Sequence, residues 1–171
     1  MNKFVISDTN ILIDLHTASL LGDFLALPAE VHTMDLVLTE IETPSIKAAV
    51  DELVREGVLL VDSITDDQME GVLELMSGNL SITDCSVWFM AKKNGWTLLT
   101  GDKALRTKAQ EDGVDVHGIL HIFDVLVNTE TISPSSATEK LRILFYYNKR
   151  IPKEEVDKRL QSWESTNFKN A

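Results

Sequence analysis

Four acidic residues stand where a parallel sheet would gather them. Asp8, Glu40 and Asp102 each follow a short hydrophobic run, and Asp84 opens a predicted helix. In an open parallel sheet, the strand ends and the starts of the following helices share one edge, and ligands bind there. Four carboxylates at that edge would repel one another unless a cation lay between them. The pattern therefore predicts a divalent-metal site.

The donor types narrow the metal and the reaction. Carboxylates with water suit Mg²⁺ or Mn²⁺, whereas zinc sites usually contain His or Cys. Cys85 is the single cysteine, and the four histidines form no ligand-spaced pair. A hard cation can activate a water and stabilise an in-line phosphoryl displacement, so phosphodiester hydrolysis is the predicted reaction. Thr9, Asn10 and Thr100 would orient the carboxylates or a water beside them.

Each acid also has a structural explanation, because aspartate is a preferred helix N-cap and carboxylates are favoured near helix N-termini. Asp8 and Asp102 each precede a predicted helix. The segment from Ser81 to Asp84 matches the capping box. Capping gives no reason for Glu40 at the end of a predicted strand. The metal-site and capping explanations both stay open from these residues alone.

Charge is distributed unevenly along this chain of 171 residues with net charge −11. Residues 1–91 hold three basic and sixteen acidic residues, whereas residues 92–171 hold thirteen basic and eleven acidic ones. An anionic substrate is therefore expected to approach the second half. The predicted phosphate-binding residues are Lys92, Lys93, Lys103 and Arg106. The alternative is an ordinary solvated helix face, and the acidic total argues against tight non-specific nucleic-acid binding.

Strand-like and helix-like segments alternate, which is typical of βαβ units around a mostly parallel sheet. The predicted strands cover residues 4–6, 34–38, 58–61, 97–100 and 114–117. Helices are predicted over residues 10–25, 45–55, 65–76, 81–93, 102–112 and 119–127, with two more that begin at Ser133-Pro134 and Pro152. We therefore predict an α/β domain over residues 1–130 and a helical C-terminal extension over residues 131–171.

Several function classes lose support from what the sequence does not contain. It has no nucleophile-elbow motif, no phosphate-binding loop motif and no dinucleotide fingerprint. Its apolar stretches are far shorter than a bilayer span, and Met1 leads directly into a predicted strand and not into a signal peptide. We expect a cytoplasmic protein that does not enter the membrane.

The order and context of the four acids resemble the PIN-domain nucleases. In that family an opening strand closes with D-T/S-N, a glutamate follows a hydrophobic run, a third acid lies near the start of a central helix, and a fourth follows a strand. The matching segments are Ser7–Asp14, Val37–Glu40, Leu80–Asp84 and Leu98–Asp102. The resemblance covers about residues 3–128.

This resemblance implies a three-layer α/β/α sandwich whose acids bind Mg²⁺ or Mn²⁺ and which cuts RNA as an endoribonuclease. Asp8, Asp84 and Asp102 would bind the metal directly or through water. Glu40, or Glu42 in its place, would complete the cluster and help to activate the attacking water. Many small bacterial members are VapC-like toxins, which an antitoxin protein holds inactive and which are often homodimers. The extension after Thr131 is longer than a minimal toxin needs.

Two alternatives to the nuclease remain open. One is a non-catalytic PIN-like module that binds RNA or protein through the same fold. The other is a haloacid-dehalogenase-like phosphatase, which would use a strand-ending Asp8 as its nucleophile. That chemistry needs a second aspartate two residues later, and the sequence has Asn10 there.

Overall fold

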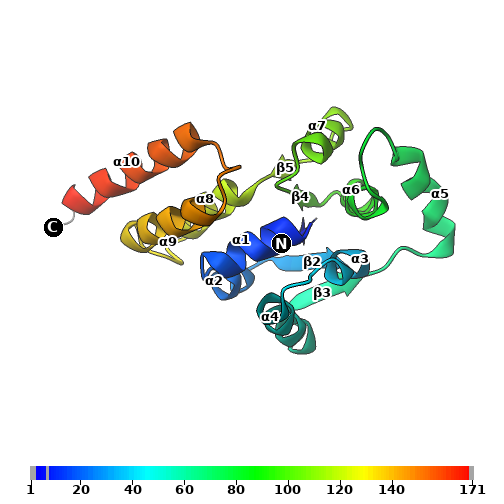
Figure 1. Cartoon of the computed structure of the whole chain (residues 1–171), viewed down its shortest axis with the longest axis horizontal. Coiled ribbons are helices and arrows are strands. Elements are labelled where there is room, and N and C mark those ends of the chain that lie inside the picture. The colour runs from blue at the N-terminus through cyan, green and yellow to red at the C-terminus, as the bar shows by residue number, and fades with distance from the viewer. Residues whose placement is uncertain (1–2, 7, 170–171) are drawn as a thin grey trace. The chain divides into compact units, whose positions relative to one another are not determined.

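The structure is a computed structural model that describes residues 3–6 and 8–169. It contains a five-stranded sheet in the order β3-β2-β1-β4-β5, and all neighbouring strands are parallel (Figure 1). The strands are β1 Lys3–Ile6, β2 Glu30–Met34, β3 Leu59–Asp62, β4 Thr97–Leu99 and β5 Val116–His117. The predicted α/β class with a parallel sheet is confirmed.

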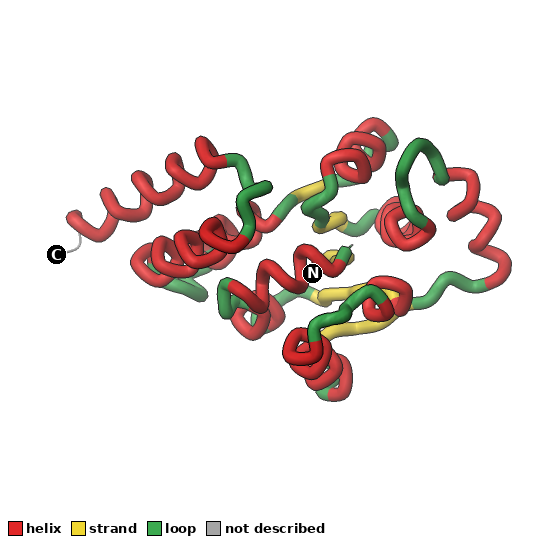
Figure 2. Tube along the Cα trace, viewed as in Figure 1, coloured by secondary structure: helices red, strands yellow, loops and turns green. Residues whose placement is uncertain are grey.

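Helices make up most of the described chain, as Figure 2 shows. They are α1 Thr9–Thr17, α2 Leu21–Leu25, α3 Asp35–Thr39, α4 Pro44–Arg55, α5 Asp66–Leu75, α6 Ile82–Asn94, α7 Lys103–Glu111, α8 Ile119–Asn128, α9 Pro134–Tyr147 and α10 Lys153–Lys169. None of these helices has the length and apolar character that crossing a bilayer requires. The predicted helix over residues 10–25 is two helices, because the chain turns between them with Ser19 at a φ of 53°.

The chain divides into two compact units. Unit 1 comprises residues 1–13 and 28–119 and contains the sheet, and unit 2 comprises residues 14–27 and 120–171. The division between a domain and an extension at residue 130 stays a prediction.

The register of the central strand aligns three strand ends. Ile6 of β1 pairs with Thr33 of β2 on one side and with Leu99 of β4 on the other. The chain therefore leaves β1, β2 and β4 at the same edge of the sheet. Asp8 and Asp102 follow two of these strands directly, so the parallel register brings both to that edge. Ser7, which belongs to the predicted motif, lies outside the described residues.

The second predicted strand is wrong. β2 is Glu30–Met34, and the apolar run that follows it forms the short helix α3. A short apolar run does not distinguish a strand from a buried helical turn. The true strand contains His32 and Thr33, which interrupt its hydrophobic pattern although both are buried. Glu40 consequently lies at the end of a helix and not at a strand end.

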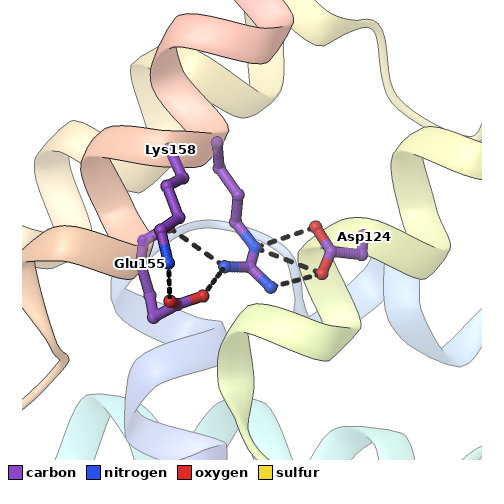
Figure 3. Close-up of polar contacts among 4 residues, drawn as sticks. Asp124, Glu155 and Lys158 are labelled. Atoms are coloured by element: carbon purple, nitrogen blue, oxygen red, sulfur yellow. Dashed lines mark hydrogen bonds and ion pairs between the residues drawn. The ribbon is translucent and has the colours of Figure 1, made fainter.

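Unit 2 is held by aromatic packing and by one arginine. The rings of Phe123 and Trp163 stack with their centroids 6.2 Å apart. Arg159 of α10 donates to Asp124 of α8 at 2.6 to 3.1 Å and to Glu155 at 3.2 Å (Figure 3). The two-pronged contact of a guanidinium with a carboxylate is stronger than a single hydrogen bond, so it fixes α10 against α8.

Candidate active site

Three of the four predicted acids lie in unit 1 at or near the N-terminus of a helix, and each accepts a backbone hydrogen bond there. The Ile11 N–H donates to Asp8 Oδ1 at 3.1 Å, and the Leu105 N–H donates to Asp102 Oδ1 at 2.7 Å. Ser81 and Asp84 form the predicted capping box, with the Ser81 N–H donating to Asp84 Oδ2 at 2.8 Å. The capping explanation is therefore correct for all three residues.

Asp8 does more than cap its helix, because it is buried and the charges of Asp84 and Asp102 act on it. The pKa of Asp8 is raised first by its burial and then by the negative charges of Asp84 and Asp102. The Ile11 amide and the Asn10 side chain oppose this shift by hydrogen bonding to the Asp8 carboxylate. The fold thus keeps a buried carboxylate within electrostatic reach of two others, as a ligand-binding edge would require.

Thr100 links two of these acids. Its hydroxyl donates to Asp8 Oδ2 at a long 3.5 Å and accepts the Asp102 N–H at 2.9 Å. Thr100 is fully buried, and its carbonyl oxygen accepts from Arg106 Nη2 at 3.0 Å. Because Arg106 reaches from α7 back to the end of β4, it holds the segment that carries Thr100 and Asp102.

The space for Arg106 depends on a glycine. A Cβ at Gly118 would lie 2.5 Å from Arg106 Nη2 and 3.5 Å from the Thr100 carbonyl oxygen. The guanidinium therefore packs directly over Gly118. Sequence reasoning missed this contact, since a single glycine before a helix gives no sign of what packs on it.

The residues fit a hard divalent cation in donor type and charge. Asp8, Asp84 and Asp102 offer only oxygen, which Mg²⁺ and Mn²⁺ prefer, and a cation among them would offset the repulsion that raises the pKa of Asp8. As these side chains are placed, no three His, Cys, Asp or Glu residues of the described chain form one metal-binding group. The caps engage Oδ2 of Asp84 and Oδ1 of Asp102, so each cap uses one carboxylate oxygen.

The other predicted site residues contribute less clearly to the group formed by Asp8, Asp84 and Asp102. Glu40 and Glu42 are exposed, and Glu40 does not contribute to the raised pKa of Asp8. Thr9 is the first residue of α1. Lys103, the first residue of α7, is exposed directly after Asp102.

Two of the predicted phosphate-binding residues lie elsewhere. Lys92 and Lys93 are in the last turn of α6, whereas Asp84 is in its first turn. Lys92 Nζ pairs with Asp112 Oδ1 at 2.7 Å, and Lys93 Nζ lies 5.9 Å from the centre of the Phe89 ring. Eight residues of helix separate Asp84 from Lys92, which is about 12 Å.

Comparison with known proteins gives both a family and a fold. The family model DUF3368, described as a PIN domain, matches residues 4–165. The protein PAE2754 from Pyrobaculum aerophilum is similar in structure, with a TM-score of 0.53 and 17% identity over 74% of this chain and 90% of that one. A PilT N-terminus domain protein from Sulfolobus solfataricus P2 gives a TM-score of 0.47 and 18% identity over 70% and 89% of the two chains. No curated protein matches.

Proposed function

The chain belongs to the PIN-domain family, and from this premise we propose that it is a Mg²⁺- or Mn²⁺-dependent endoribonuclease. PIN domains are usually nucleases, they generally bind nucleic acid, and they typically use divalent metals. This membership sets aside the phosphatase alternative. The observation that carries the proposal is the setting of the Asp8 carboxylate: it is buried, Thr100 links it to the Asp102 amide, and its pKa is raised by burial and then by the charges of Asp84 and Asp102. Perturbed carboxylates of this kind gather at catalytic sites more often than elsewhere.

In the proposed reaction, Asp8, Asp84 and Asp102 would hold the cation, and Glu40 would complete the set. When bound, such a cation lowers the pKa of a water and stabilises charge on the phosphate oxygens. Asn10 and Thr100 hold the Asp8 carboxylate in place through their hydrogen bonds. A carboxylate that is already oriented costs less to arrange when the substrate arrives.

The basic residues divide into two groups under this proposal. Lys103 is exposed beside Asp102 and binds the RNA phosphate, whereas Arg106 positions Thr100 through the carbonyl contact. Lys92 and Lys93 would contact RNA farther from the scissile bond. The Asp112 carboxylate already offsets the charge of Lys92, so its contribution to binding is expected to be small.

The deciding experiment separates the two roles of Asp84. Asp84→Asn keeps an oxygen that can accept the Ser81 N–H but removes the charge, whereas Ser81→Ala removes the hydroxyl of the same capping box and keeps the carboxylate. We expect Asp84→Asn to lower Mn²⁺-dependent cleavage of a labelled RNA by about 100-fold or more. Loss of a residue that only supports a metal ligand costs up to about 100-fold, and loss of a ligand itself should cost at least as much. Ser81→Ala should stay within a few-fold of the wild type.

Equal cleavage by Asp84→Asn and the wild type would refute the assignment. If Mn²⁺ titration shows binding that Asp84→Asn weakens while the wild type cleaves no RNA, the chain is a non-catalytic PIN-like module. The finer proposal is a VapC-like toxin with an antitoxin protein partner and a homodimeric state. In that case, expression of the wild type arrests bacterial growth and expression of Asp84→Asn does not.

A further inference from the structure

The last turn of α9 exposes aromatic side chains that the fold does not bury. Tyr146 and Tyr147 are each 71% exposed, and their rings meet edge to face with centroids 5.1 Å apart. Ile143, one turn earlier, is also exposed. Exposed aromatic and apolar side chains that lie together mark an interaction surface more often than single exposed ones do.

The segment around these rings is the most basic part of an acidic chain. Residues 140–153 contain five basic residues and no acidic residue, although the whole chain has a net charge of −11. The basic residues are Lys140, Arg142, Lys149, Arg150 and Lys153. Glu164 pairs with Arg142 at 2.6 Å and Asp157 pairs with Lys153, which offsets part of this charge. The remaining positive charge attracts anions to this segment.

Lys149 joins the charge to the rings. Its Nζ lies 4.4 Å from the centre of the Phe145 ring and 5.6 Å from the centre of the Tyr146 ring. Within the described residues Lys149 forms no ion pair with a carboxylate, whereas Lys153 pairs with Asp157. The ammonium of Lys149 is therefore available to a ligand while the rings hold it in place.

The backbone under this surface is anchored. Asn148 Nδ2 donates to both oxygens of Asp14 at 3.0 Å, and the Arg150 N–H donates to Asn148 Oδ1 at 3.1 Å. Leu144 and Ile151 are buried on either side of the turn. A surface that is fixed before binding loses less conformational entropy when the ligand arrives.

We propose that Phe145, Tyr146, Tyr147 and Lys149 form a stacking surface that binds single-stranded RNA. Bases stack on the tyrosine rings, and the Lys149 ammonium binds the phosphate backbone, which is how proteins hold single strands without reading their sequence. Tyrosine is common in both protein and nucleic-acid interfaces, but a lysine placed over the rings favours nucleic acid, because the centres of protein interfaces are depleted in lysine. The choice of RNA rests on the proposed function.

Fluorescence anisotropy with the full-length chain tests the stacking. The probe is a labelled, unstructured oligouridine of about 12 nucleotides, within the range of single-strand site sizes, and EDTA prevents cleavage. We expect the double variant Tyr146→Ala/Tyr147→Ala to bind about tenfold more weakly or worse, since each stacked base contributes to affinity. Tyr146→Phe/Tyr147→Phe keeps both ring faces and should bind within about twofold of the wild type.

Two lysines provide the matched test of charge. Lys149→Gln removes a cation without an acidic partner, whereas Lys158→Gln removes one that already pairs with Glu155 at 2.6 Å. The slope of log affinity against log salt should fall by about 0.7 for Lys149→Gln, the value for one phosphate contact on a single strand. The slope should change little for Lys158→Gln.

Wild-type affinity in the double alanine variant would overturn the proposal. So would a loss of self-association in that variant with unchanged RNA affinity, because the surface would then bind a second copy of the chain. The outcome is separable from the nuclease test. If the wild type binds RNA through the tyrosines but never cleaves it, the stacking surface is supported and the endoribonuclease proposal is wrong. If the wild type cleaves RNA and its binding does not depend on the tyrosines, the endoribonuclease proposal is supported and the stacking surface is wrong.

Discussion

Two buried aspartates of similar exposure differ in the charges that act on them. Asp8 precedes α1 and is 8% exposed, and Asp14 lies within the same helix and is 7% exposed. The amide of Asn148 donates to both oxygens of Asp14. Asp8 instead has the charges of Asp84 and Asp102 close by, and its pKa is raised by burial and by these charges.

This difference predicts a structural role for Asp14 and, under the proposed function, a ligand-binding role for Asp8. A buried carboxylate normally costs free energy unless donors satisfy it, and Asn148 supplies such a donor to Asp14. Asp8 also accepts hydrogen bonds, from the Ile11 N–H and the Thr100 hydroxyl, but the negative charges of Asp84 and Asp102 act on it as well. Such an arrangement lowers the stability of the metal-free protein, and it is maintained where the charge serves ligand binding.

The largest expected effect comes from making the Asp14 region resemble the Asp8 region. Asn148→Asp replaces the donating amide with a second carboxylate and should lower the free energy of unfolding by about 3 kcal/mol or more, as for other uncompensated buried charges. Asn148→Ala, which only removes the donor, should cost about 2 kcal/mol. Urea denaturation at neutral pH measures both. Equal losses in the two variants would show that repulsion is unimportant there.

The converse change should relieve the Asp8 region. Asp8→Asn keeps an acceptor for the Ile11 N–H and removes the charge. The pKa of Asp8 is raised, so its contribution to stability is complete below the unfolded pKa of about 3.9 and is lost as pH rises through the folded pKa. In EDTA, Asp8→Asn should therefore be more stable than the wild type at neutral pH, and the gap should close toward about pH 4. Thermal unfolding across this pH range measures it.

Asp67 is the matched control for that prediction. The Thr65 hydroxyl lowers the pKa of this exposed carboxylate, so its stabilising contribution is present above the unfolded pKa and is lost as pH falls. Asp67→Asn should thus lower stability at neutral pH, opposite in sign to Asp8→Asn. With Mn²⁺ added, the wild type should gain stability and Asp8→Asn should gain less. A destabilised Asp8→Asn protein in EDTA would contradict the comparison.

Sequence reasoning succeeded where local chemistry decides the structure. The capping box at Ser81, the N-cap Asp102 and the glycine that ends α6 all act within a few residues, and Gly95 has a φ of 65°. The parallel sheet was predictable as well, because strand-like and helix-like segments alternate along the chain. The prediction of β2 was wrong because contacts with neighbouring elements, which the sequence pattern does not show, stabilise its polar residues. His32 contacts Asp62 Oδ2 at 2.6 Å and the ring of Trp96.

The site was harder to predict, since charge alone does not reveal a partner. Arg106 and Lys92 were both assigned to phosphate binding from their sign and their position after the acids. The structure pairs Lys92 with Asp112, twenty residues away, and directs Arg106 to a backbone carbonyl. Contacts between separate helices and strands decide such roles, and residue spacing along the chain does not predict these contacts.

The smallest expected effect concerns how Thr100 is held against Asp8. In Gly118→Ala, the added methyl group would displace the Arg106 guanidinium and break its contact with the Thr100 carbonyl oxygen, at a cost of about 1 kcal/mol. RNA cleavage should fall by up to about tenfold, because a support of a metal ligand is loosened and the ligand itself stays.

Two controls test whether Gly118→Ala acts through Arg106: an alanine substitution at a glycine with free space around it, and a double-mutant cycle. Gly22 lies in α2 with nothing within 4 Å of an added Cβ, so Gly22→Ala should be neutral or stabilising by up to about 1 kcal/mol. Arg106→Gln alone should match Gly118→Ala in urea denaturation and in cleavage. If the methyl group acts only through the guanidinium, the double variant is no worse than either single one, because both changes remove the same contact. Additive losses would instead mean that Gly118 supports the active site by a separate route.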